Sequence, residues 1–253
     1  MTQRLPRMTE YLTDPEPISP EAASPAVTAR KRPQPGERRA QILQALAAML
    51  EQPGAERITT AGLAARLSVS EAALYRHFAS KAQMFEGLID FIEQAVFPLV
   101  QQITGTGTGV VTGTGTDTET SVPDPLPAPL PAPHDGTRQA GRVVALLLQF
   151  GERNPGLVRV MVGDALVLEN ERLQQRMNQF FDRIESTLRQ CLRAAWAQSA
   201  TPTVDAQVAA NVLMAFAQGR LQRHARSGFK RLPTEHLEAS LALMGVDCAR
   251  SSG

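Results

Sequence analysis

Apolar residues recur at three- and four-residue intervals in many segments of this chain, a spacing that predicts amphipathic α-helices. The first predicted helix is Glu37–Glu51, and Gln52-Pro53-Gly54 should end it. Two short helices follow within Arg57–Phe85, on either side of Ser68-Val69-Ser70, and a third helix begins at Ser80. The short pair is too small to fold alone, so we expect it to pack against the first helix.

The two short helices have the size and separation of a helix-turn-helix, whose second helix enters the major groove of DNA. A hydroxyl residue can cap each helix: Thr59 or Thr60 the first, Ser70 the second and Ser80 the third. If the apolar side chains of the second helix point inward, its other positions point outward. These outward candidates for DNA binding are Glu71, Ala72, Tyr75, Arg76 and His77. The alternative is a plain three-helix packing unit.

Lys81 stands one residue after the Ser80 cap, where the helix dipole disfavours a cation. A phosphate drawn by the free N–H groups of the helix start would explain a lysine there. Lys81 is therefore a further candidate for DNA binding, and the alternative is a solvated surface charge.

A long helix, roughly Lys81–Ile103, should follow, with Glu86, Asp90 and Glu93 on its wet face and Pro98 kinking it or ending it early. Thr104–Gly136 is rich in Gly, Thr and Pro, contains no lysine or arginine, and predicts a flexible insert.

Helical patterns resume after the insert. Arg138–Phe150 should be a buried helix ended by Gly151, and Asn154-Pro155 should cap and start a helix over Gly156–Leu168. Long helices over Asn170–Trp196 and from a Thr203 cap to Arg226 should follow, with a short one at the end.

The two long C-terminal helices carry apolar or small-residue rows that can pair with a second copy as a four-helix bundle. The alternative is an intramolecular core. The candidate dimer-interface residues are Leu173, Met177, Phe180, Ile184 and Leu188 on the first helix, and Val208, Val212, Ala215 and Gly219 on the second.

Charge and reactive residues restrict the function classes. The formal net charge is +1, so any affinity for DNA must come from locally placed charge, such as the basic run Arg30–Arg39. Four scattered histidines and two distant cysteines give no spacing typical of a metal site, a cofactor site or a catalytic triad, which argues against an enzyme. The N-terminus lacks the apolar core of a signal peptide and no apolar run reaches membrane-spanning length, so we expect a soluble cytoplasmic protein without a membrane span.

The predicted organisation is all-α. A disordered basic tail (1–35) precedes a helix-turn-helix domain (36–82), a linking helix (83–103), a flexible insert (104–136) and a helical dimerisation and partner-binding domain (137–246).

The run TTAGLAARLSVSEAALYRHFASK and this order of elements resemble the TetR family of DNA-binding proteins. Within that family, Arg57–Glu93 and Val143–Gln190, with FGERNPGL and LENERLQQRMNQ, are similar to the nucleoid occlusion factors. The resemblance implies a homodimer on palindromic DNA that antagonises the division protein FtsZ and resides on the nucleoid, with no cofactor. It also implies DNA-facing roles for Thr59, Thr60, Ser70, Ala72, Tyr75, His77 and Lys81, to which we add Arg57.

The same resemblance implies a surface for FtsZ where the fourth helix meets the FGERNPG turn. Its candidate residues are Phe91, Leu146, Gln149, Arg153 and Asn154. Core positions and a helix cap are the alternatives for these residues. The sequence departs from the pattern at Ser68, where the turn often has glycine, and at Leu99 and Gln149, where a basic residue and a glycine are expected. A ligand-responsive TetR-type repressor is the alternative function.

Overall fold

The computed structural model describes residues 7–8, 36–52, 58–105, 135–167, 169–197 and 205–246, and every regular element in these ranges is helical. The first four helices are α1 (Glu37–Leu50), α2 (Thr60–Arg66), α3 (Glu71–Tyr75) and α4 (Lys81–Thr104). They are followed by α5 (Asp135–Arg153), α6 (Pro155–Met161), the 3₁₀ turn η2 (Asp164–Leu166), α7 (Glu171–Trp196), α8 (Ala206–Arg226) and α9 (Leu237–Leu243).

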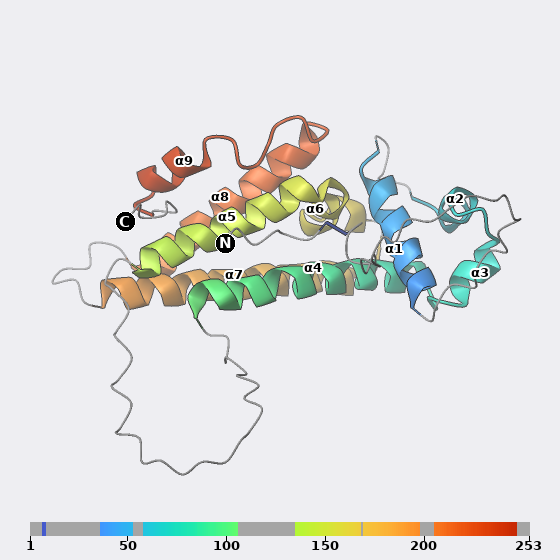
Figure 1. The fold of residues 1–253 in the computed structure, drawn as a ribbon, viewed down its shortest axis with the longest axis horizontal. Helices are drawn as coiled ribbons and strands as arrows, with labels where there is room; N and C mark the ends of the chain where they lie inside the picture. Colours follow the sequence, from blue (N-terminus) through green and yellow to red (C-terminus); the bar gives the residue numbers. More distant parts are fainter. Residues whose placement is uncertain are drawn as a thin grey trace, which may run out of the picture.

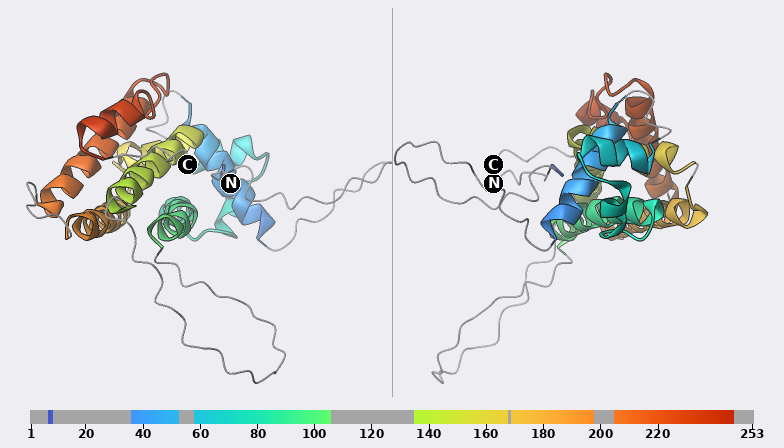
Figure 2. Two further views of the ribbon diagram at one scale, coloured as in Figure 1. Left: turned by 60° about the vertical axis from the view of Figure 1, so that its left-hand side comes forward. Right: turned by 90° about the vertical axis from the view of Figure 1, so that its right-hand side faces the viewer.

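The molecule is elongated, with α1, α2 and α3 at one end and the long helices forming the rest (Figure 1). Seen from near their ends, α4, α5, α7 and α8 group as a bundle beside the N-terminal helices (Figure 2). The helix α7 packs on both α5 and α8, and α4 packs on α5 and α7. One continuous apolar core therefore runs from the short N-terminal helices into the bundle.

Local capping sets the starts of α2, α3 and α4, as the sequence predicts. Thr59, rather than Thr60, caps α2, because its Oγ1 accepts a hydrogen bond from the Gly62 N–H at 3.1 Å. Ser70 and Ser80 cap α3 and α4 in the same way. The predicted Thr203 cap is wrong, since α8 begins after Asp205, whose carboxylate accepts from the Gln207 N–H.

The predicted end of the long helix near Ile103 is confirmed, since α4 continues to Thr104 and stops at Gly105, which is left-handed with φ 70°. Of the two effects predicted for Pro98, the early end is therefore wrong. The helix end predicted at Gly151 is also wrong, because α5 continues to Arg153. Gly151 lies inside α5, where a Cβ atom would come within 2.5 Å of Leu221, so this glycine allows α5 and α8 to approach.

Three further predictions on element bounds need correction. The helix predicted for Gly156–Leu168 is the shorter α6, which ends at Met161 before the left-handed Gly163. The predicted insert is too long at both ends, since Thr104 belongs to α4 and Gly136 to α5. The remainder of the insert, the tail apart from residues 7–8, Arg57 and Thr201–Thr203 lie outside the described residues.

Gly156 lies where the N-terminal helices meet the bundle. A Cβ atom there would lie 2.1 Å from the carbonyl oxygen of Ala47 in α1. Such a distance is far inside van der Waals contact with backbone, so α1 and α6 pack this closely only with glycine at position 156.

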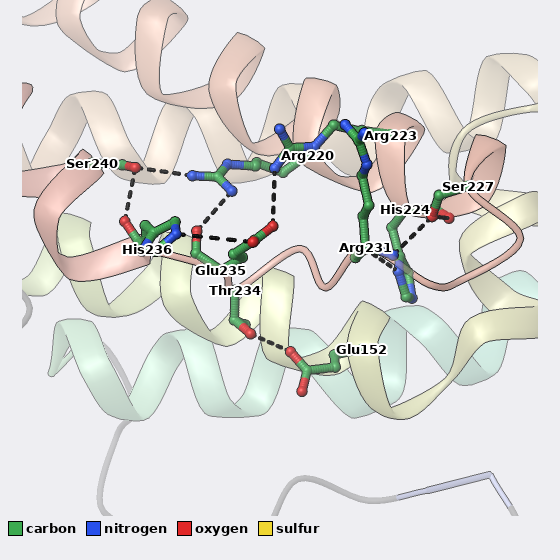
Figure 3. Close-up of polar contacts among 10 residues, drawn as sticks. All are labelled: Glu152, Arg220, Arg223, His224, Ser227, Arg231, Thr234, Glu235, His236 and Ser240. Atoms are coloured by element: carbon green, nitrogen blue, oxygen red, sulfur yellow. Dashed lines mark hydrogen bonds and ion pairs between the residues drawn. The ribbon is translucent and has the colours of Figure 1, made fainter.

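The C-terminal part of α8 is fastened to α9 by a polar cluster (Figure 3). Arg220 donates to the Glu235 carbonyl at 2.7 Å and to Ser240 Oγ at 2.9 Å, and Thr234 donates to the Glu152 carboxylate of α5. His224, only 2% exposed, lies at the other end of this cluster.

The ring of His224 is held in one tautomer. Its Nδ1 lies 2.7 Å from the Arg231 carbonyl oxygen, so Nδ1 carries the hydrogen and donates it. Burial lowers the pKa of His224 below its ordinary value, and the Arg231 bond and the Glu152 charge oppose this shift without cancelling it. The folded protein therefore binds this proton less readily than the unfolded chain.

Replacing Gly156 by alanine should destabilise the protein by about 1–3 kcal/mol, the usual cost of forcing extra atoms into a packed interior. Denaturant unfolding measures this loss. Gly87→Ala in α4 is the matched control, because its Cβ would meet only the side-chain end of Leu43, at 3.0 Å. Equal effects of the two substitutions would contradict the assignment of Gly156 to a backbone contact.

Stability should fall as the pH drops below about 6.5, because the unfolded chain takes up the His224 proton first. Above that pH, both states hold the ring neutral and His224 contributes no pH dependence. His224→Gln keeps an N–H donor but does not titrate, so its unfolding midpoint should change less between pH 7.5 and 5.5. His236→Gln, at a largely exposed histidine, should retain the full change. An unaltered pH dependence in His224→Gln would refute this role.

Candidate DNA-binding surface and partner groove

The second helix of the helix-turn-helix presents the predicted residues to solvent. Glu71, Ala72, Arg76 and His77 are exposed, and Tyr75 is 46% exposed. The apolar Leu74 and Phe78 are each 1% exposed and anchor the helix in the core. The predicted inward and outward faces of α3 are therefore confirmed.

The turn between α2 and α3 accommodates a side chain where many such turns carry glycine. Ser68 is left-handed with φ 54°, a conformation that costs a residue with a Cβ atom some strain. The next N–H, that of Val69, donates to the Ala64 carbonyl at 3.0 Å and closes the turn. Thr60 Oγ1 then donates to the Glu71 carboxylate at 2.6 Å, which joins α2 to α3. The pairing of these two side chains cannot be predicted from the sequence, because it depends on how α2 and α3 pack.

Arg39 of α1 positions the end of α3. Its guanidinium lies 4.2 Å from the centre of the Phe78 ring, and its Nη1 donates to the His77 carbonyl at 3.1 Å. A cation over an aromatic face is attracted by the ring quadrupole. The sequence placed Arg39 in a basic run without a specific role.

Lys81 has a carboxylate partner. Its Nζ lies 2.5 Å from Oε1 of Glu169, which stands just before α7 and whose side chain is only 10% exposed. The Lys81 side chain remains 31% exposed. This ion pair offsets the unfavourable position of a cation at the start of α4, and the sequence could not reveal it because the partners are far apart in the chain.

The acidic residues of α4 also lie against α7. Arg176 donates to Asp90 Oδ1 and Glu93 Oε2, each at 2.6 Å. Burial acts to lower the pKa of Arg176, but the hydrogen bonds to Glu93 and Asp90 outweigh it and raise the pKa above its ordinary value. Two of the residues predicted for the wet face of α4 thus bridge α4 to α7.

The predicted partner-binding residues come from α4, α5 and the turn after α5. Leu146, Gln149 and Arg153 share one face of α5, at intervals of three and four residues. Gln149 and Arg153 are exposed, whereas Leu146 is 8% and Phe91 7% exposed. Phe91 packs against Phe150, with ring centres 6.5 Å apart. The apolar pair therefore lies mostly in the core, with the polar pair at the surface.

Asn154 is buried, and its side chain does not cap α6. Its Nδ2 donates back to the Phe150 carbonyl of α5 at 3.0 Å, and its Oδ1 accepts from the Met8 N–H at 3.0 Å. A groove of about 360 Å³ opens beside it, with Arg153 and Asn154 in its wall. A second groove of about 260 Å³ is lined by Phe91 and α1 residues. Met8 lines both grooves.

The two predicted dimer rows differ in exposure. The row on α7 is buried within a single chain, with Leu173, Met177, Phe180, Ile184 and Leu188 each at most 1% exposed. The row on α7 therefore belongs to the intramolecular core. On α8, Val208 and Val212 are 54% and 49% exposed, and Ala215 and Gly219 are exposed as well. Only the α8 row presents a surface to a second copy.

Neither a membrane-spanning helix nor a metal-type cluster of three or more His, Cys, Asp or Glu side chains occurs among the described residues.

Comparison with known proteins identifies the family of this chain. The family model described as "Bacterial regulatory proteins, tetR family" matches residues 42–88, and "Tetracyclin repressor-like, C-terminal domain" matches residues 137–247. The nucleoid occlusion factor SlmA of Idiomarina loihiensis is 46% identical over 208 residues, covering 82% of this chain and 93% of its own. The SlmA of Vibrio cholerae is 45% identical, covering 83% of this chain and 94% of its own.

The chain belongs to the SlmA family of nucleoid occlusion factors. SlmA proteins are DNA-binding regulators of the TetR type and not enzymes. Among solved structures, the TetR regulator PfmR of Thermus thermophilus aligns with a TM-score of 0.58 at 19% identity, covering 83% of this chain and 100% of PfmR. The regulator FadR of Bacillus subtilis aligns with 0.56 at 13% identity, covering 83% of this chain and 98% of FadR. These two likenesses show the all-α TetR fold alone.

Proposed function

We propose that this SlmA-family chain binds a palindromic chromosomal site as a homodimer and, when bound there, antagonises FtsZ assembly. It would then reside on the nucleoid in the cytoplasm. The observation that carries the proposal is that one helix, α4, belongs to both candidate surfaces. Its first residue, Lys81, adjoins the helix-turn-helix, and Phe91, ten residues further on, lines the second of the two grooves described above.

The DNA surface would consist of α3 and the adjoining helix starts. Tyr75 and Arg76 project from α3, and Thr59 and Ser70 offer the starts of α2 and α3, where backbone N–H groups favour phosphate. Because Glu71 is held by Thr60, it would position α3 and would not contact a base directly.

A second copy would dock along the exposed row of α8. Two apolar valines and the small Ala215 and Gly219 allow another helix to approach closely, and a Cβ atom at Gly219 would have no atom of the described residues within 4 Å. Dimers present two recognition helices to two half-sites, so this row would set the palindrome that the protein reads.

The partner surface would combine the exposed Gln149 and Arg153 with the two adjoining grooves that share Met8, one beside Asn154 and one beside Phe91, which together form the partner groove. An arginine beside a partly apolar groove is a frequent energetic centre of protein interfaces. The alternative of a ligand-responsive repressor gains no support from the segment Val143–Leu148, where Val143, Val144, Leu147 and Leu148 pack as a filled core at 1% exposure or less.

Lys81→Ala should weaken binding to all DNA sequences alike and make the salt dependence of the binding constant shallower by about 0.9 log units per log unit of salt, the effect of one lost phosphate contact. Fluorescence anisotropy at several salt concentrations measures this. Glu169→Gln should do the opposite, since it frees the Lys81 ammonium from its ion pair. A change confined to sequence preference, with the salt dependence intact, would rule out a phosphate contact by Lys81.

Arg153→Ala should leave DNA affinity unchanged and reduce FtsZ binding by at least about tenfold, as expected for an interfacial arginine of this kind. Sedimentation of FtsZ polymers, with and without a palindromic site that the protein binds, reports the loss of DNA-dependent disruption. Arg142→Ala is the matched control, because Arg142 is another exposed arginine of α5, about three turns away. If the Arg153 variant remains fully active on FtsZ polymers, the partner surface lies elsewhere.

A further inference from the structure

One residue of the N-terminal segment, Met8, is built into the folded molecule. Its side chain is 8% exposed and belongs to the apolar core cluster. Its N–H donates to Asn154 Oδ1 at 3.0 Å, and its carbonyl accepts from Gln44 Nε2 at 3.1 Å. The short dark blue segment beside α1 and α6 marks its position (Figure 1). Both backbone polar groups and the side chain of Met8 thus have partners in the folded domain.

These contacts are those of a peptide in a binding groove. Met8 lies where the two grooves meet: one is lined by Gln44, Arg153 and Asn154, the other by Leu43 and Phe91. A buried apolar side chain supplies affinity, and side chains that pair with the peptide backbone fix its position without reading further sequence. Asn154 suits this task because its Nδ2 is fixed on the Phe150 carbonyl, which directs Oδ1 toward the Met8 N–H.

We propose that Met8 is an internal ligand of the partner groove, held there by Asn154 and Gln44, and that FtsZ must displace it. The proposal rests on the proposed function, because Phe91, Arg153 and Asn154 line the two grooves that Met8 also lines. The occupant is identified by the structure itself, since the backbone groups that Asn154 and Gln44 hold belong to Met8.

An internal ligand competes well even when its own affinity is low. A tethered segment has an effective concentration on the order of 1 mM. With a dissociation constant of about 0.1 mM it would occupy the groove in about nine-tenths of the molecules, and the apparent Kd for an external ligand would rise about tenfold.

The first test uses a fluorescein-labelled peptide of residues 1–14 and the full-length chain. The peptide should bind the Met8→Ala chain about tenfold more tightly than the wild-type chain, whose own Met8 already occupies Asn154 and Gln44. Met8→Gln, a second release variant, should behave as Met8→Ala does. Leu243→Ala, at a 90% exposed leucine of α9, is the control and should match wild type. A peptide that itself carries Met8→Ala should bind none of them. Equal affinity of the normal peptide for wild-type and Met8→Ala chains, or no saturable binding, would overturn the proposal.

The second test measures FtsZ affinity and DNA affinity of the same chains. Met8→Ala should bind FtsZ about tenfold more tightly, by the same release of the groove, and DNA equally well. Weaker FtsZ binding by Met8→Ala and Met8→Gln, with both chains folded, would overturn the proposal by making Met8 part of the partner surface. If FtsZ binds no variant while the peptide still distinguishes the chains, the internal ligand stands and the proposed function fails.

Discussion

The close packing of α1 on α6 is the constraint on which the rest of the molecule depends. Gly156 brings the two helices so near that the Ala47 carbonyl would collide with any Cβ atom at that position. The short helices α2 and α3 cannot form a stable unit alone, so they take their position from α1 and α4. Arg39 of α1 also fixes the position of α3, because its guanidinium contacts residues at the end of that helix. The orientation of the recognition helix toward DNA is therefore decided in part by a contact with the C-terminal domain.

The long helix α4 transmits that arrangement along the molecule. It starts at its Ser80 cap, pairs with Glu169 through Lys81, packs Phe91 against Phe150 and is bridged to α7 by Arg176. The Arg176 bridge joins one guanidinium to two carboxylates in a partly buried setting, where charge-assisted hydrogen bonds are stronger than in water. These contacts fix α4 against its neighbours at its start and at two points along its length.

The sequence predicts features whose causes are local. The caps at Ser70 and Ser80 follow from a hydroxyl next to a free N–H, and the inward Leu74 follows from helical spacing. Features that depend on residues far apart in the chain cannot be predicted from the sequence. Periodicity shows that Met177 lies on an apolar face but does not tell a core face from a dimer face. The pairs Lys81–Glu169 and Thr60–Glu71, and the role of Gly151 against Leu221, arise only when separate helices come together.

Both candidate surfaces share one physical property, which is that the chain already supplies a partner for the groups that would bind. Lys81 is paired with Glu169, and Asn154 accepts from the Met8 N–H. A ligand that replaces an internal partner gains only the difference between the two interactions, so weak or incomplete ligands are rejected. The Glu169 side chain is nearly buried and leads directly into α7, whereas Met8 belongs to none of the described helices. Under the proposed function, a ligand that replaces Glu169 as the partner of Lys81 would therefore change the packing of the bundle. A ligand that replaces Met8 as the partner of Asn154 would change only the access to the groove.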